Sequence, residues 1–340
     1  MNILYNCDNN YLPYAGTSIT SLFENNKELD EINVYIIGFE ISDMNIVKLN
    51  RLAEQYGRSI TLVDAKDIDN FFVRNGARIW RGSLATFYRL FIDQVIPENV
   101  DRVLYIDADT VVVDSLKDLE AFEFEDHKAC AMTYDRVFDG YNEYIHLPTD
   151  KPYYNAGVIL FDLKKWRAFD CSKKIMKAIE KGYASFAVAD QDLLSHAVND
   201  NIQLLNPRYN VFSCWIDLGV KNINAYLEVN NDNTNYYLPR ELESALANPA
   251  ILHCRSIHTH APWVKHSRNP FRGEWVKYNE VSPWKNVESV KAKLKLNKKV
   301  SRALFYTLPK PLYCRIIKTY NIYQVKKYYS NLGRIDNAMK

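Results

Sequence analysis

The stretch Arg102-Val-Leu-Tyr-Ile106-Asp107-Ala108-Asp109 joins a strand pattern directly to two carboxylates. Its apolar run, 103–106, is continuous, which is typical of a central strand buried on both faces of a parallel sheet. A β-branched segment, Thr110-Val-Val-Val113, follows. Ligands of such sheets gather beyond the carboxyl ends of the strands. The stretch therefore predicts a buried strand that delivers two acidic side chains to a ligand site.

The chain on either side of this stretch alternates strand and helix patterns. The expected strands are 2–6, 32–37, 59–63, 102–106, 157–161 and 249–252, and the expected helices are 17–24, 43–56, 84–92 and 190–198. This alternation predicts an α/β fold with a mostly parallel central sheet and helices on both faces. Residues 220–248 are rich in Asn and other polar residues, and we expect an irregular insertion there.

Length and charge predict two unequal parts. The 340 residues suffice for one large α/β domain and a smaller appendage. Residues 281–340 hold 14 Lys or Arg and two acidic residues, a net charge of +12, whereas the first 280 residues carry 29 basic and 39 acidic side chains, a net charge of −10. We therefore expect a main domain over 1–280 and a basic, aromatic, helical extension over 281–340.

Several features exclude whole classes of protein. The sequence has no run of about 18 apolar residues and no secretory signal pattern. Its six cysteines are scattered without a CxxC pair, which favours reduced thiols and a cytoplasmic location. It also lacks GxGxxG and P-loop motifs, which argues against a dinucleotide or nucleoside triphosphate cradle.

The two carboxylates suit a divalent cation. Asp107 and Asp109 stand one residue apart, so both can turn into the same cleft with the small Ala108 between them. Mn²⁺ and Mg²⁺ prefer hard oxygen ligands and typically take one or two carboxylates together with phosphate oxygens. An acidic turn in which Asp109 caps the next element explains the same residues. These residues alone leave both interpretations open.

Seven segments in a fixed order add a more specific signal. They are Asn6–Tyr11, Tyr88–Leu90, Val103–Thr110, Tyr154–Val158, Phe161–Trp166, Asp190–Leu194 and Ile251–His253. Together they resemble glycosyltransferase family 8, the retaining transferases that include glycogenin-like proteins and bacterial lipopolysaccharide galactosyltransferases. The resemblance implies a single GT-A domain, Rossmann-like in architecture, that moves galactose or glucose from a UDP-sugar to a hydroxyl of a cell-surface glycan, capsule or lipid-linked saccharide.

The resemblance also implies roles for individual residues. A Mn²⁺ or Mg²⁺ ion would be held by Asp107, Asp109 and His253. The UDP-sugar donor would be bound by Asp8, Asn10, Tyr11, Arg89, Asp107, Ala108 and Asn155, with Arg81 and Ser83 as weaker candidates. The candidate catalytic residues are Gln191, Asp190 and Asp135. Without the resemblance, most of these residues would be explained as turn, cap or ion-pair residues.

The segment after His253 departs from the family pattern. The family places Gly three residues after the histidine and Lys-Pro-Trp at positions six to eight. Here the spacing to Pro262-Trp263 is two residues longer, the Gly is absent, and Ala261 stands in place of Lys. His253 and His258 therefore both stay candidates for the third metal ligand, and His253 is preferred because the apolar strand Ala250-Ile-Leu252 leads directly to it. The lost Lys ammonium could be replaced by Arg255, His260 or Lys265.

The resemblance places Gln191 under the anomeric carbon, and an amide is a poor nucleophile. This favours front-face attack by the acceptor hydroxyl over a covalent intermediate. A nucleotidyltransferase is an alternative, although residues 8–14 lack its glycine-rich and basic triphosphate loop. A catalytically silent UDP-sugar-binding module is another. The acceptor itself depends on the loops around 136–150 and 210–245.

The extension has its own alternatives. Basic residues interleaved with Tyr, Phe, Leu and Ile over 285–340 suit the anionic inner face of a membrane, where the protein would attach peripherally. A helical pair packed on the main domain explains the same composition. No recognised nucleic-acid-binding motif accompanies the charge, so nucleic acid is not expected as a partner.

Overall fold

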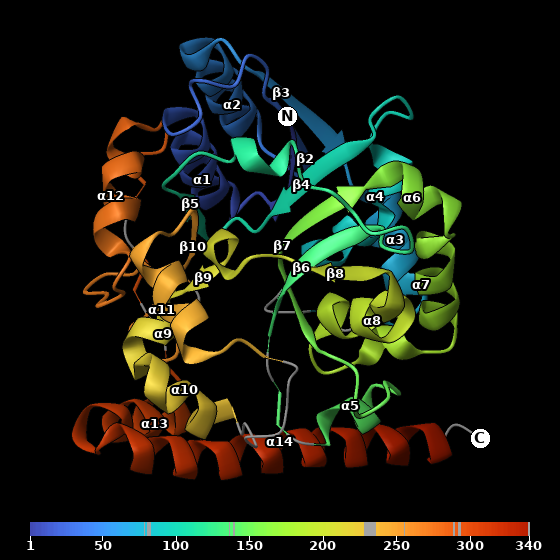
Figure 1. Cartoon of the computed structure of the whole chain (residues 1–340), viewed down its shortest axis with the longest axis vertical. Coiled ribbons are helices and arrows are strands. Elements are labelled where there is room, and N and C mark those ends of the chain that lie inside the picture. The colour runs from blue at the N-terminus through green and yellow to red at the C-terminus, as the bar shows by residue number, and fades with distance from the viewer. Residues whose placement is uncertain are drawn as a thin grey trace.

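A computed structural model of the chain describes residues 1–77, 79, 83–135, 137–138, 140–227, 236–254, 256–287, 290–291 and 294–338. Among them, seven strands form one sheet in the order β3-β2-β1-β4-β7-β6-β8 (Figure 1). Their bounds are β1 (Asn2–Asp8), β2 (Asn33–Phe39), β3 (Ser59–Asp64), β4 (Arg102–Ile106), β6 (Cys130–Tyr134), β7 (Tyr154–Asp162) and β8 (Ile202–Leu204). Only β7 runs antiparallel to its neighbours, β4 and β6. The predicted mostly parallel sheet is confirmed.

A second, three-stranded sheet lies beside the first. It has the order β5-β10-β9, formed by β5 (Thr110–Val112), β10 (Ile251–His253) and β9 (Val211–Phe212). The helices are α1 (Leu12–Glu24), α2 (Asp43–Tyr56), α3 (Lys66–Arg74), α4 (Ile92–Val95), α5 (Tyr141–Tyr144), α6 (Leu163–Ala168), α7 (Cys171–Glu180), α8 (Ala189–Val198), α9 (Ser213–Leu218), α10 (Val220–Leu227), α11 (Pro239–Ala247), α12 (Arg272–Val281), α13 (Leu296–Thr307) and α14 (Lys310–Ala338).

Helices cover both faces of the large sheet, and this explains the apolar run in β4. Val103 and Tyr105 belong to a buried cluster with α7 and α8. Leu104 and Ile106 point to the opposite face and join a cluster with α1 and α2. Because successive side chains of a strand alternate between faces, a strand buried on both must be apolar throughout.

The expected buried helix over 84–92 is present as a 3₁₀ helix, Ala85–Phe91, followed by the single-turn α4. Six of its seven residues are buried, so packing rather than regular backbone pairing sets its tight conformation.

The expectation of an irregular insertion over 220–248 was wrong, because this segment contains two helices, α10 and α11. Leu242 and Ala245 of α11 stand three residues apart and are buried against the small sheet. Such spacing marks one face of a helix, but the Asn-rich composition of the segment obscured it. The Asn-rich residues 228–235 themselves lie outside the described part of the chain.

The C-terminal extension is helical, as predicted, and packs on the rest of the molecule. Phe305 of α13 and Tyr313 and Ile317 of α14 are buried in the cluster that covers the three-stranded sheet. Further along α14, the ring of Tyr329 stacks on Tyr144 at 4.9 Å. Figure 1 shows α14 running along one whole edge of the molecule, past α10 and α5. Within the described residues, no helix has the length and apolarity needed to cross a bilayer.

Trp284 ties the end of the main domain back to its beginning. Its side chain is fully buried, and its indole Nε1 donates a hydrogen bond to Asn45 Oδ1 of α2 at 2.9 Å. The ring lies against Gly16 of α1 so closely that a Cβ there would be 2.3 Å from it. The division at residue 280 stays a prediction, and this contact lies just beyond it.

We predict that Trp284→Ala lowers the free energy of unfolding by about 3–5 kcal/mol, because it empties a fully buried aromatic site. Urea unfolding followed by circular dichroism measures the change. Val281→Ala, at a half-exposed position of α12, is the matched control and should stay within about 0.5 kcal/mol of wild type. A Trp284→Ala change no larger than the control would contradict the prediction.

Candidate active site

The turn that carries Asp107 and Asp109 connects the two sheets. After β4 the chain leaves the large sheet, and β5 pairs antiparallel with β10 so that His253 lies opposite Thr110. Two backbone bonds fix the turn: Asp107 N–H donates to Gly157 O at 2.8 Å, and Cys254 N–H donates to Asp109 O at 2.9 Å. This register brings His253 to the two carboxylates, although it is far from them in sequence.

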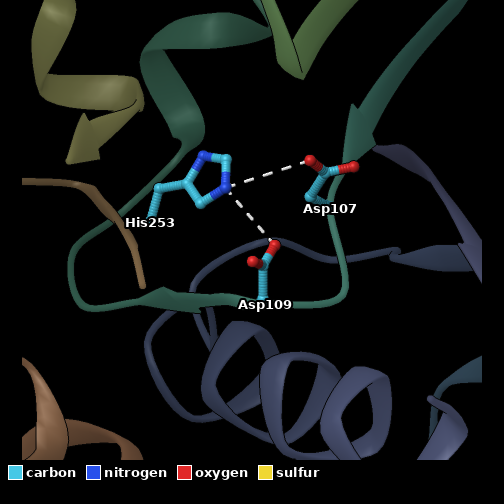
Figure 2. A group of neighbouring side chains, drawn as sticks. All are labelled: Asp107, Asp109 and His253. Carbon is cyan, nitrogen blue, oxygen red and sulfur yellow. Dashed lines mark ion pairs between the residues drawn. The ribbon is translucent and has the colours of Figure 1, made fainter. Parts of the chain in front are cut away.

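Figure 2 shows the imidazole of His253 facing both carboxylates. Its Nε2 lies 3.3 Å from Asp109 Oδ1 and 3.9 Å from Asp107 Oδ2. One ligand atom from each of the three residues falls within 4.8 Å of the others. Two carboxylates and a neutral imidazole are a donor set that Mn²⁺ accepts, so the residues fit the implied metal.

His258, the other candidate ligand, is engaged elsewhere. Its Nε2 lies 2.8 Å from Tyr313 Oη and 2.9 Å from Ser301 Oγ, both in the C-terminal helices. Burial lowers the pKa of His258 to about 4, and the nearby cations Lys298 and Arg302 act in the same direction. The geometry therefore favours His253 over His258 as the third ligand.

Asn210 orients His253, a role that the sequence analysis missed. The Nδ2 of Asn210 donates to Asn155 Oδ1 and to Thr133 Oγ1, both at 2.8 Å. Asn155 Oδ1 already accepts from Gly157 N–H, so it is an oxygen, and the Asn210 atom facing it must be the amino group. Asn210 Oδ1, 2.9 Å from His253 Nδ1, therefore accepts a hydrogen bond from the N–H group of that nitrogen. The Nε2 lone pair is left to face the carboxylates.

Position 157 requires glycine because the imidazole of His253 lies directly against it. A Cβ at this position would lie 2.5 Å from His253 Cε1 and 2.9 Å from Asn155 Oδ1. Both distances are shorter than any normal contact, so the ring could not keep its place beside a larger residue. The Asn155-Ala156-Gly157 segment thus supplies one hydrogen-bonding amide and the space in which the histidine sits.

Arg89 is a buried cation between two carboxylates. Its Nη2 lies 3.0 Å from Asp107 Oδ1, and its Nε lies 3.3 Å from Asp190 Oδ2. The guanidinium also rests 3.9 Å from the ring centre of Tyr105, whose hydroxyl donates to Asp107 at 2.5 Å. Burial raises the pKa of Asp190, while Arg89 and a hydrogen bond from Thr86 oppose the shift. Arg89 thereby links a candidate metal ligand to a candidate catalytic residue.

The other catalytic candidates form a connected amide and carboxylate network. Asp135 Oδ2 accepts from Asn155 Nδ2 at 3.0 Å and from Gln191 Nε2 at 3.2 Å. Gln191 Oε1 accepts from Asn155 Nδ2 at 3.1 Å and from Ala156 N–H at 3.2 Å. Through Asn155 this network continues to Asn210 and His253. The structure therefore brings Gln191, Asp135 and Asn155 together beside the candidate metal site.

The residues proposed for the nucleotide lie at the carboxyl end of β1. Asp8 Oδ1 accepts from the backbone N–H groups of Asn10 and Tyr11, both at 2.9 Å, so its carboxylate shapes the turn before α1. Tyr11 is exposed and packs edge-on against Tyr14 and Trp263. Trp263 stacks on Tyr14 at 4.1 Å, which shows that the altered segment still delivers an aromatic ring to this end of the molecule.

The remaining candidates have more local environments. Ser83 Oγ accepts from Ala85 N–H at 3.1 Å, and the side chain of Ala108 is buried. Arg81 and Arg255 lie outside the described residues. His260 contacts Arg302 of α13 through its Nε2. None of these contacts tests a role toward UDP.

The sequence profile of glycosyl transferase family 8 matches residues 2–263. The chain belongs to this family. Because the match covers well over half of the chain and ends at Trp263, the altered segment lies inside it and α13 and α14 lie beyond it.

Individual relatives agree with the family. A putative glycosyltransferase of Haemophilus influenzae is 30% identical over 213 residues, which cover 62% of this chain and 63% of that protein. The lipopolysaccharide 1,2-glucosyltransferase of Escherichia coli K12 is 28% identical over 251 residues, which cover 69% of each. The galactosyltransferase LgtC, solved with donor and acceptor sugar analogues, aligns with a TM-score of 0.67 at 22% identity over 88% of this chain and 99% of LgtC. The expected GT-A fold is confirmed.

We predict that Asn210→Ala weakens Mn²⁺ binding by about 10- to 100-fold, because it removes the acceptor that keeps a proton on His253 Nδ1. Asn210→Asp retains an acceptor and should lose less affinity. Isothermal titration with MnCl₂ measures both variants, and Asn222→Ala in α10 is the control. Wild-type affinity in both Asn210 variants would refute the proposed orientation of His253.

Proposed function

We propose that the protein is a metal-dependent, retaining hexosyltransferase that moves galactose or glucose from a UDP-sugar to a hydroxyl of a glycan acceptor. The observation that carries this proposal is the convergence of Asp107, Asp109 and His253 at the turn between the two sheets. Family membership supports sugar transfer as the reaction. Relatives named as lipopolysaccharide glucosyl- and galactosyltransferases support a hexose donor and a cell-surface glycan as acceptor.

The hard step in such a transfer is departure of UDP while positive charge builds at the anomeric carbon. When bound, Mn²⁺ or Mg²⁺ would neutralise negative charge on the diphosphate as a Lewis acid. Arg89 holds Asp107 and Asp190 in fixed positions, so these carboxylates need no reorganisation during the reaction. Asp8, Asn10 and Tyr11 would hold the nucleotide, and Asn155 the sugar.

Retention of configuration is proposed to occur by attack from the front face. The bond between the anomeric carbon and the UDP oxygen breaks with its electron pair on UDP. The acceptor oxygen bonds to the same face, and its proton passes to the departing phosphate. Gln191 suits this route because its Oε1 already accepts two hydrogen bonds and an amide is a weak nucleophile. A glycosyl adduct trapped on Gln191 or Asp190 would overturn this mechanism.

We predict that wild-type protein releases UDP from UDP-galactose or UDP-glucose when Mn²⁺ is present, and that chelation with EDTA abolishes the release. Asp109→Asn should fold normally but lose roughly 100-fold of this activity, because a charged ligand is replaced by a neutral one. Asp118→Asn, at an exposed position, is the matched control. A coupled UDP assay measures the rates.

The same assay separates the alternatives. A nucleotidyltransferase would consume a nucleoside triphosphate together with a sugar phosphate, and it would release no UDP from UDP-sugars. A silent binding module would bind UDP-sugar without turnover. Full activity in Asp109→Asn, with whichever donor is used, would show that the proposed metal site is wrong.

For the extension, we propose peripheral contact with an anionic membrane surface through the outer face of α14. Leu312, Ile316 and Tyr323 are exposed and stand four and seven residues apart on the helix, so they form one stripe. The basic residue Arg315 lies within this stretch of sequence, and Lys326 and Lys327 follow it. Apolar and aromatic residues beside basic ones favour the interface of an anionic bilayer.

We predict that the full chain floats with vesicles of phosphatidylglycerol and phosphatidylcholine, and that Ile316→Glu combined with Tyr323→Glu reduces binding at least about tenfold, since burying each such side chain contributes about 2 kcal/mol. Val281→Glu on α12 is the control. Point substitutions are preferable to removal of the tail, because α13 and α14 also bury Phe305 and Tyr313. Equal flotation of the double variant and wild type would remove the membrane proposal.

A further inference from the structure

A cavity of about 250 Å³ lies between the main domain and the C-terminal helices. Its inner wall includes Asp135, whose carboxylate accepts hydrogen bonds from Asn155 and Gln191. Phe212, which packs against the ring of His253 at 5.4 Å, lines it as well. The cavity therefore begins at the network that surrounds the candidate metal and catalytic residues.

The opposite wall of the cavity comes from the C-terminal extension, residues 281–340, which we also call the tail. Asn297, Lys298 and Ser301 of α13 and Tyr313, Tyr320 and Asn321 of α14 line the cavity. These residues lie beyond the part of the chain that matches the family profile, which ends at residue 263. One wall thus lies within the matched family profile, and the other lies beyond it.

The lining suits a sugar. Trp215, Tyr236 and Tyr313 present aromatic rings, which can pack on the C–H face of a pyranose ring. Hydroxyl and amide groups, among them those of Ser301 and Asn321, can bond sugar hydroxyls. The lining thus combines polar side chains with aromatic rings, and the volume leaves room for about one sugar ring.

The charge at the tail side of the cavity is positive. Lys298 lines it, and Arg302 and Lys310 lie close enough to affect the neighbouring His258. The whole segment 281–340 contains only two acidic residues, Glu288 and Asp336. An anionic substituent on the ligand would therefore be attracted to the α13 side, while the ring extends toward Asp135.

We propose that this cavity is an acceptor subsite for an anionic saccharide, one whose carboxylate or phosphate faces Lys298 while a hydroxyl points toward Asp135. The inference rests on the proposed function, because it takes the network around Gln191 and Asp135 as the place of sugar transfer. It assigns α13 and α14 a part in acceptor selection that is separate from any membrane contact by the outer face of α14.

The test uses three probes that differ in charge: methyl β-glucuronide, glucose 6-phosphate and neutral methyl β-glucoside. Saturation-transfer NMR on the full chain measures their binding. The expected result is preference for both anionic probes, a loss of at least tenfold for both in Lys298→Glu, and loss of all three in Asn321→Trp, which fills the cavity. Lys299→Glu, an exposed neighbour that does not line the cavity, should bind all three like wild type.

The outcomes are distinguishable. Binding unaffected by Asn321→Trp and by Ser301→Trp, a second filling variant, would overturn the site. Equal losses in Lys298→Glu for charged and neutral probes, or no preference among them, would overturn the anionic specificity. If Lys298→Glu weakens binding of one anionic probe more than the other, that probe's carboxylate or phosphate is the group that the site recognises. UDP release by wild-type protein without acceptor is measured separately, and its absence would overturn the proposed function rather than the cavity.

Discussion

The register between β5 and β10 is the constraint on which the candidate site depends. β5 follows the Asp107–Asp109 turn immediately, so pairing Thr110 with His253 puts the imidazole against the carboxylates. A one-residue slip would turn every side chain of the strand to the other face, and His253 would no longer face the two carboxylates. The register is secured because Val111 and Leu252 are buried in one cluster while Val112 and Ile251 are buried in another.

A buried charge network then fixes what the register brings together. Taking Arg89, Asp107 and Asp190 out of water costs free energy, and the pairing must offset that cost. The guanidinium adds a hydrogen bond to Ala156 O and a cation–π contact with Tyr105. Such a network is weak evidence for stability, but it holds charged groups in position before any ligand arrives. It explains why polar residues cluster where the sheet is otherwise apolar.

The sequence allowed some of this to be predicted and not the rest. β4 and the helix Asp43–Tyr56 were predictable because burial leaves a local apolar period. Asp107 and Asp109 were conspicuous because they interrupt such a run. Asn210 was not conspicuous in the sequence, since its role arises from three partners that are distant along the chain, Thr133, Asn155 and His253. The preference for His253 over His258 was predictable from the apolar segment that leads to it, but the strand register that brings its imidazole to the carboxylates was not.

The tail is joined to the candidate site by packing rather than merely attached beside it. Phe305 and Tyr313 share a buried cluster with Phe212 and Leu252, which belong to the same small sheet as His253. His258, held by Ser301 and Tyr313, stands five residues after the candidate ligand and links the same segments. Closely packed cores transmit displacement because they leave few voids to absorb it. A displacement of α13 or α14 is therefore expected to reach the strand that carries His253.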